Sequence, residues 1–281
     1  MARRSQLLKR KSDSIIYLFY AITIVFFLFP ILCIISISLK TPAEIFGNPS
    51  LIPKSPTLEN YAFVWNHTKM PIYIKNSLIL VLYTVIGTLI VASLSAYGLS
   101  RFNFKHKSLV VILILMFQMI SDVVICIPLF RFFSQVGLLN KHWVLGFVYV
   151  ATQTPFATYL LKGVFDGIPR AMDESASIDG ANRLTILTRI ILPCSKSGIS
   201  STIIFLSINA WSSFLLPFIL LSKDKMRPVS VGILTVQGMF MDITIQNLAA
   251  ASVLGLLPAI LIVVFLQKFI ISAMMSGAVK G

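Results

Sequence analysis

Long apolar stretches alternate with short polar segments along the whole chain. Six stretches have apolar residues around most of a helical circumference, as helices do that face lipid or lie inside a bundle. Each is close to the roughly 20 residues that a helix needs to cross a bilayer. The pattern predicts an all-α polytopic membrane protein with six transmembrane helices, at about Ser14–Leu39, Asn76–Leu99, Leu109–Phe132, Trp143–Leu161, Gly198–Leu221 and Leu248–Ile271.

The polar segments divide the chain into parts. We expect a basic N-terminal segment at 1–13, a first transmembrane helix at 14–39, an extracytoplasmic loop at 40–75, a core of five helices at 76–271 with a loop at 165–197, and a tail at 272–281. Five prolines in the loop at 40–75 predict an ordered but irregular segment. A second long loop is expected from about Ser222 to Asn247. Both loops are either solvated linkers or contacts for an external partner.

The composition supports a membrane protein. Of 281 residues, 57% are hydrophobic and only 12% are charged, whereas soluble domains carry roughly 25% charged residues. The net charge of +14 would suggest nucleic-acid binding in a soluble protein. Here the basic residues lie beside apolar stretches, where membrane orientation and anionic lipid explain them more simply.

The orientation follows from the basic residues. With the N-terminus in the cytoplasm, 15 of the 24 Lys and Arg residues lie on the inside, which is the side where they are enriched in membrane proteins. The first apolar stretch is longer than a signal-peptide core and lacks an Ala-x-Ala site, so we expect a retained anchor. The prediction is a multi-pass protein of the cell (inner) membrane with both termini cytoplasmic.

The sequence shows no pattern typical of a disulfide framework, a metal site or a catalytic site. The three cysteines share no short spacing, and the three histidines are far apart in the sequence. Neither a disulfide framework nor a metal site is expected, and we expect no cofactor. The chain has no Gly-x-x-x-x-Gly-Lys-Ser/Thr phosphate loop, so it is not expected to hydrolyse ATP or to be an enzyme.

The segment at 165–197, which we call the hairpin, is the one long run of mixed charge. Pro169 suits the first turn of a helix, Gly180 can end that helix with a positive φ, and Asn182 can cap a second one. Acidic residues near the first N-terminus agree with the helix dipole. Helical spacing places Leu184, Leu187 and Ile191 on one face, and Pro193 is expected to close the second helix. These features alone fit either an interfacial helix with snorkelling arginines or a surface that a partner outside the bilayer binds.

The residue pattern of the hairpin distinguishes these readings. It resembles the cytoplasmic signature loop of binding-protein-dependent ABC importer permeases: Glu-Ala-Ala, three residues, Gly, nine residues, then Ile-x-Leu-Pro. Here the pattern is Glu174-Ser175-Ala176, Gly180 and Ile190-Ile191-Leu192-Pro193, with Ser175 as the one departure. Further segments resemble the carbohydrate-uptake (maltose-type, multiple-sugar) branch: Asp179-Gly180-Ala181, Asn209-Ala210-Trp211, Ser252-Val253-Leu254 with Pro258, Gln267-Lys268-Phe269, and Ser276–Gly281.

The resemblance implies a type I ABC importer permease fold and a transport role. The chain is then expected to form the path for a sugar or oligosaccharide, with a coupling helix around Glu174–Gly180 that docks on a separate ATPase subunit. Implied partners are an ATPase dimer, a second homologous permease, an extracytoplasmic solute-binding protein, a carbohydrate substrate and membrane lipid, but no nucleic acid.

Glu174 is expected to pair with a basic group of the ATPase, Ala176 to allow close approach, and Gly180 to set the angle between the two helices. Leu187 and Ile191 are expected to tie the hairpin to the bundle. The coupling residues implied are Glu174, Ser175, Ala176, Asp179, Gly180, Ala181, Leu187, Ile190, Leu192 and Pro193.

Polar residues at membrane depth are candidates for the translocation path. Asp122 is the one carboxylate expected there, and an ionisable group inside a membrane is a functional candidate by default. In one continuous helix it would share a face with Gln118 and Cys126. Asp122 can line the path, serve structure or a subunit interface, or lie near the membrane surface. Similar groups elsewhere also bond helices to each other without touching substrate. The candidate path residues are Gln118, Asp122, Tyr149, Gln153, Asn209 and Trp211.

Two other classes of protein fit the sequence less well. An ion-coupled secondary transporter commonly has inverted repeats and paired midplane charges, whereas this chain shows no clear repeat and a single acid. A membrane-embedded enzyme would need a metal or Ser/His/Asp grouping, and none is evident in the sequence.

Overall fold

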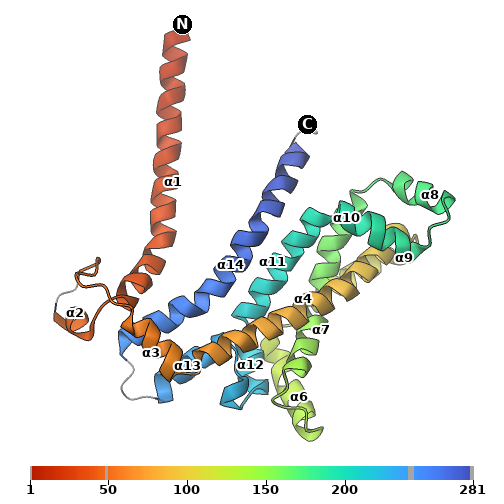
Figure 1. Cartoon of the computed structure of the whole chain (residues 1–281). Coiled ribbons are helices and arrows are strands. Elements are labelled where there is room, and N and C mark those ends of the chain that lie inside the picture. The colour runs from red at the N-terminus through yellow and green to blue at the C-terminus, as the bar shows by residue number, and fades with distance from the viewer. Residues whose placement is uncertain (1, 48–49, 240–243, 279–281) are drawn as a thin grey trace. The chain divides into compact units, whose positions relative to one another are not determined.

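The computed structural model describes residues 2–47, 50–239 and 244–278, with side chains at 16–47, 50–234 and 244–268 (Figure 1). Every regular element among these residues is a helix, which confirms the all-α class. The chain forms two compact units, Met1–Thr68 with Val236–Leu254 and Lys69–Thr235 with Gly255–Gly281. Residues 279–281 of the expected tail lie outside the described residues, and 272–278 continue the last helix, α14 (Ile245–Ala278).

The first unit is built on α1 (Ala2–Ser38), which includes the apolar span Ile16–Ser38. The helix also includes the basic segment from Ala2 onward. Two short helices, α2 (Pro42–Gly47) and α3 (Glu59–His67), occupy the loop that we expected to be irregular. The side-chain amide of Asn60 holds α3 to the end of α1 by donating to the carbonyls of Ser38 (2.8 Å) and Lys40 (2.9 Å).

The second unit centres on α4 (Met70–Arg101), α7 (His142–Asp166) and α11 (Lys196–Ser212). Small residues lie where these helices cross, as is common between membrane helices. A Cβ atom on Gly146 would lie 2.8 Å from Cβ of Tyr83, and one on Gly198 would overlap the side chain of Val164. Glycine therefore allows α7 to approach α4, and α11 to approach α7.

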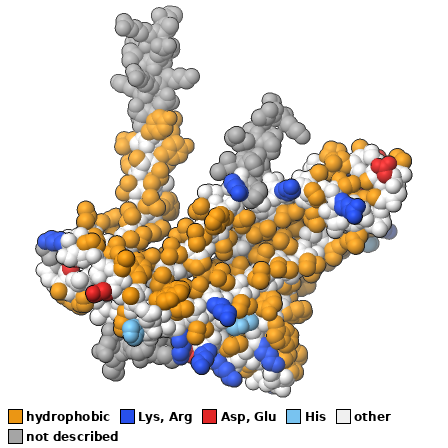
Figure 2. Space-filling model, viewed as in Figure 1, with side chains coloured by type: hydrophobic (Ala, Val, Ile, Leu, Met, Phe, Trp, Pro, Cys, Tyr) orange, Lys and Arg blue, Asp and Glu red, His pale blue; other side chains and the backbone are white. Residues whose placement is uncertain are grey.

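Four described helices are long and apolar enough to cross a membrane: Ile16–Ser38, α4, α7 and Ile245–Lys268. The number rises to six if each of two bent helix pairs is one span. Hydrophobic side chains cover most of the visible surface (Figure 2), as lipid-facing helices require. The predicted spans near residues 76–99, 143–161 and 248–271 lie within α4, α7 and α14.

The predicted continuous helix at 109–132 is wrong. It is divided into α5 (Lys107–Phe117) and α6 (Asp122–Gln135), bent by 80°. Ser121 is extended (φ −69°, ψ 143°), and its hydroxyl accepts a hydrogen bond from the backbone N–H of Val123 at 3.3 Å. A side chain that caps a helix in this way stabilises a new start at the cost of continuity.

The predicted helix at 198–221 is also interrupted, between α11 and α12 (Leu215–Leu220). Pro217 has no N–H to donate to the carbonyl four residues earlier, at Ser213. That carbonyl instead accepts from the hydroxyl of Ser230 at 2.7 Å. Ser230 lies in α13 (Val229–Met239), so part of the expected loop at 222–247 is helical.

The Met70 end of α4 holds the segment that precedes α13. This segment contains a 3₁₀ turn, η2 (Asp224–Met226). Asp224 pairs with Lys69 and accepts from the Tyr73 hydroxyl at 2.6 Å. The amide of Asn76 donates to the carbonyls of Lys225 and Arg227, each at 2.9 Å. The segment is therefore fixed to α4 rather than solvated as a linker.

Candidate functional site

The hairpin lies beyond the Arg101 end of α4 and the Asp166 end of α7 (Figure 1). It consists of α8 (Arg170–Ile178), α9 (Arg183–Ile186), a π-helical turn (Leu187–Ile191) and α10 (Leu192–Cys194). Gly180 has a φ of +83° between α8 and α9, and Asn182 caps α9 by accepting from the N–H of Thr185 at 2.8 Å. Both features confirm the predicted helix–turn–helix. Pro169 lies immediately before the first helical residue of α8. Pro193 does not end the second helix, because α10 extends one residue further, to Cys194.

An apolar cluster joins the hairpin to the bundle. Ala176, Ile186, Leu187 and Ile191 are buried against side chains of α4, α7 and α11, including Phe165. Leu184, which we expected to share one face with Leu187 and Ile191, is 61% exposed. The π turn changes the spacing after Ile186, so that Ile186 takes the buried place instead. Ala176 packs on the chain's own bundle.

A buried ion pair fixes α8 to the end of α4. Nε of Arg101 donates to Oδ2 of Asp173 at 2.7 Å, and the side chains are 5% and 8% exposed. The guanidinium also donates to the carbonyls of Phe165 (3.0 Å) and Ile168 (3.2 Å) at the α7–α8 connection. Arg101 therefore bonds three segments at one point. Charged groups removed from water persist only when paired and hydrogen-bonded, and this pair meets both conditions.

A neighbouring contact joins α4 to α7 at the same end. The hydroxyl of Ser100 donates to Oδ1 of Asp166 at 2.7 Å. Asp166 also pairs with Lys162, at 2.5 Å, on a more exposed surface. The ends of α4 and α7 and the start of α8 thus form one bonded junction.

The other coupling candidates differ in their exposure. Glu174, Ser175, Asp179, Gly180 and Pro193 are exposed, whereas Ala181, Ile190 and Leu192 are half-buried. Ile178, on the same short helix as Glu174, is 86% exposed. The outward side of α8 thus presents a carboxylate and a large apolar side chain next to each other.

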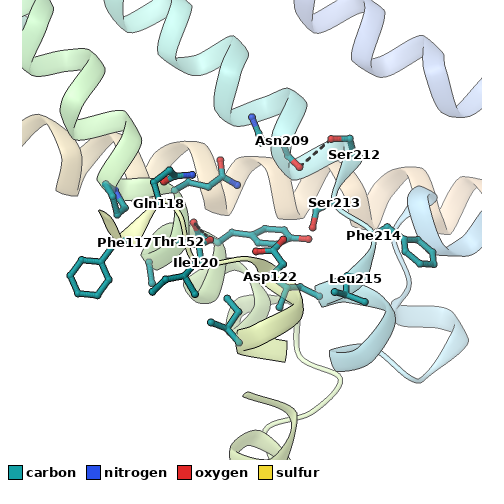
Figure 3. A pocket seen from close by; sticks show the side chains of 16 residues that line it. Phe117, Gln118, Ile120, Asp122, Thr152, Asn209, Ser212, Ser213, Phe214 and Leu215 are labelled. Atoms are coloured by element: carbon teal, nitrogen blue, oxygen red, sulfur yellow. Dashed lines mark hydrogen bonds between the residues drawn. The ribbon is translucent and has the colours of Figure 1, made fainter. Parts of the chain in front are cut away.

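A cavity of about 560 Å³, which we call the chamber, lies where the two interrupted helices meet α7. The α5–α6 break supplies Gln118 and Asp122, and the α11–α12 break supplies Ser213 (Figure 3). Polar groups of α7 form another wall. The lining residues are Phe117, Gln118, Ile120, Asp122, Ile125, Tyr149, Ala151, Thr152, Gln153, Pro155, Asn209 and 212–216.

Five of the six path candidates line this chamber: Gln118, Asp122, Tyr149, Gln153 and Asn209. Trp211 does not line it. Its ring is buried, and Nε1 donates to the carbonyl of Gly255 in α14 at 3.2 Å, so it joins helices.

The prediction that Gln118 and Asp122 share one face of a continuous helix is also wrong. Gln118 caps the end of α5, so it shares no helical face with Asp122 in α6. The turn between the helices brings both to the chamber, while Cys126 is buried outside its lining.

Two buried polar atoms of the lining form no hydrogen bond of normal geometry with any residue that the structure describes. They are the hydroxyl of Tyr149, which is 2% exposed, and Oε1 of Gln153. Ser213 interacts with the Tyr149 hydroxyl electrostatically, but the pair forms no hydrogen bond of normal geometry. Both atoms are buried in the wall of the chamber, where polar atoms usually have partners.

Sequence reasoning missed two parts of the site. Phe117, Ile120, Phe214 and Leu215 were predicted only as parts of two apolar spans, because the breaks that turn them to the chamber were not predicted. Arg101 was counted only as an orienting charge. The available signal was a basic residue at the end of an apolar helix, together with an acidic residue, Asp173, in the hairpin.

Comparison with known proteins identifies the fold and family. Residues 88–276 match the family described as the binding-protein-dependent transport system inner membrane component. The chain belongs to this family. Among its relatives, the trehalose/maltose transport system permease protein of Thermococcus litoralis is 34% identical over 90% of this chain and 92% of its own length. The arabinooligosaccharides transport system permease protein of Bacillus subtilis is 32% identical, with 94% of each chain covered.

A solved structure shares the permease fold. It is a bacterial ABC transporter involved in the import of the acidic polysaccharide alginate, with a TM-score of 0.79, 20% identity, and coverage of 92% of this chain and 96% of its own. The likeness establishes the type I permease fold for this member of the family. The hairpin and the chamber lie within the residues matched to the family.

Proposed function

We propose that this permease is the membrane-spanning subunit of an ATP-driven ABC importer and forms the path for a sugar or oligosaccharide. The observation that carries the proposal is a polar chamber lined in part by α7 and α11, two of the three helices that also pack against the hairpin. Relatives named for trehalose/maltose and arabinooligosaccharides support a carbohydrate cargo.

Coupling to the energy source is assigned to α8. Its exposed Glu174 and Ile178 form a compact surface for a cleft on a separate ATPase subunit. Movement of α8 would pass to α4 through Asp173 and Arg101, because that pair is buried and bonded on several sides. The Ser100–Asp166 bond would carry the same movement to α7. A rigid connection of this kind lets an ATPase dimer shift the helices between inward-open and outward-open states.

The remaining coupling candidates support this surface. Asp179, Gly180 and Ala181 form the turn between the hairpin helices, and Ser175 shares the exposed side of α8. Leu187, Ile190, Leu192 and Pro193 join the turn to the bundle. The chain itself supplies no nucleotide site in this scheme.

The proposed assembly contains an ATPase dimer, a second homologous permease and an extracytoplasmic solute-binding protein. A structural neighbour titled as an alginate transporter in complex with a pentasaccharide-bound periplasmic protein supports the last of these. The hairpin then faces the cytoplasm, as do both termini. Gln118, Asp122, Tyr149, Gln153 and Asn209 form this subunit's share of the path.

The test is reconstitution with the ATPase and substitution of Glu174. The Glu174→Gln variant keeps the shape of the side chain but removes its charge, so ATPase copurification and ATP-driven saccharide uptake should both fall at least tenfold. Glu59→Gln is a matched control, because Glu59 is an exposed carboxylate on α3. Undiminished copurification and uptake in Glu174→Gln, or saccharide transport by this chain without an ATPase, would contradict the proposal.

A further inference from the structure

The chamber has an unbalanced charge. Asp122 is the first residue of α6, and its carboxylate points into the chamber beside Ser213 (Figure 3). None of the described residues that line the chamber is Lys, Arg or His. Asp122 forms no ion pair with any residue in the described part of the chain. The chamber wall that this chain supplies therefore carries one negative charge and no positive one.

The hydrogen-bonding groups of the chamber also favour one kind of cargo. An ionised carboxylate only accepts hydrogen bonds, so Asp122 needs donors. Sugar hydroxyls supply donors, and an ammonium group supplies both donors and a countercharge. A carboxylate, sulfate or phosphate on the cargo supplies neither.

Electrostatic repulsion adds to this preference. Two like charges separated by several ångströms in a partly hydrated protein cavity repel each other. Salt screens such a pair less in a cavity than on an open surface. An anionic cargo group would thus meet a barrier here that a neutral hydroxyl does not.

We propose that Asp122 makes the chamber selective by charge: it admits neutral and amino-bearing saccharides and disfavours saccharides with carboxylate, sulfate or phosphate groups. This inference rests on the proposed function for its cargo, but the charge of the chamber can be measured without any cargo. The permease fold alone does not determine this selectivity, because the charge of a path depends on the residues that line it and not on the arrangement of the helices.

The experiment uses the assembled transporter in proteoliposomes and a reporter cysteine in the chamber. Cys33, Cys126 and Cys194 are first replaced by Ser, Ala and Ser. Ser213→Cys is then introduced, and Ser212→Cys serves as a second, more exposed reporter. The reaction rates of each cysteine with a cationic trimethylammonium-ethyl and an anionic sulfonato-ethyl methanethiosulfonate are compared with Asp122 and with Asp122→Asn.

We expect the ratio of cationic to anionic reaction rates to fall on the order of tenfold in Asp122→Asn, the effect of one charge at a nearby site. Glu59→Gln removes the same charge from α3 and should leave the ratio unchanged. A ratio within twofold of the parent in Asp122→Asn would overturn the proposal, since a partner's cation would then neutralise the carboxylate. Unreactive cysteines at both positions would also overturn it, because a cargo chamber must admit small reagents.

A second measurement separates this inference from the proposed function. ATP-driven uptake of maltotriose, of a chitosan trisaccharide and of an alginate trisaccharide is measured with both forms of residue 122. Asp122→Asn should raise alginate uptake relative to maltotriose by several-fold, and an unchanged ratio would contradict charge selection. If the reagent ratio shifts as expected but no saccharide is transported, the chamber charge stands and the saccharide function fails.

Discussion

Removal of the Arg101 guanidinium should release α8 from the bundle. The Arg101→Met variant keeps an apolar stem of similar length but leaves the carboxylate of Asp173, which is 8% exposed, without its cation. Loss of one partner of a buried ion pair typically costs about 3–5 kcal/mol. The carbonyls of Phe165 and Ile168 would lose their hydrogen bonds as well.

The size of this effect sets the assay. Local opening of a segment exposes its amides to hydrogen exchange, and each 1.4 kcal/mol changes an equilibrium about tenfold. In the assembled transporter, amides of Arg170–Ile178 should therefore exchange at least about a hundredfold faster in Arg101→Met. ATP-driven uptake should fall with it, because the proposed connection from α8 to α4 is lost.

Two further variants control this prediction. Lys162→Met breaks the more exposed Lys162–Asp166 pair, whose side chains are 20% and 42% exposed. Such pairs contribute about 0–1 kcal/mol, so exchange in α8 should change less than about fivefold. Adding Asp173→Leu to Arg101→Met removes the unpaired charge and should recover part of the protection. If Arg101→Met leaves exchange in α8 within about threefold of the parent, the ion pair does not hold the hairpin.

Three more predictions concern other contacts. At Gly180, φ is +83° and no atom crowds an added Cβ. Gly180→Ala should therefore destabilise the hairpin by about 1–2 kcal/mol through backbone strain alone and weaken ATPase copurification. Gly163→Ala, in a helix where the added Cβ meets open space, should do neither. Gly198→Ala should lower the thermal stability of the purified complex through overlap with Val164, and Val164→Ala in the same chain should restore it. Burial of Asp224 opposes its ionisation, but the hydrogen bonds and charges of Lys69, Tyr73 and Arg227 outweigh this and hold the pKa of Asp224 below its ordinary 3.8. Its ionised form is thus stabilised by folding, and the contribution is complete above that value and lost as the pH falls through the lower folded pKa. In the parent, the exchange protection of residues 222–228, corrected for the intrinsic exchange rate, should stay constant between about pH 7 and pH 5. Asp224→Asn should lower this protection at both pH values. A loss of protection in the parent at pH 5 would contradict the lowered pKa of Asp224.

Much of the fold follows from the sequence because lipid leaves few choices for an apolar stretch. The spans in α4, α7 and α14 were predicted, since apolar length alone decides them. In the hairpin, Gly180 and Asn182 signal the turn and the cap through their own chemistry. The family signature at Glu174–Pro193 added the proposed role.

The breaks in the other helices could not be predicted from hydropathy. Residues on both sides of Ser121 and Ser213 are apolar enough to continue a span, and the interruptions depend on which partner a hydroxyl or carbonyl finds in the folded chain. The same breaks turn Asp122 and Gln118 toward Asn209. The Arg101–Asp173 pair was missed for a related reason: its partners are far apart in sequence, and only packing shows that both are buried.

Site-specific photocrosslinking from α8 tests the central claim most directly. A benzophenone amino acid at Ile178, which is 86% exposed, should crosslink this permease to the ATP-hydrolysing subunit in the assembled transporter. The same label at the exposed Leu58, in the loop between α2 and α3, should not reach that subunit. Crosslinks from Ile178 to lipid alone, with an active ATPase present in the complex, would contradict the account.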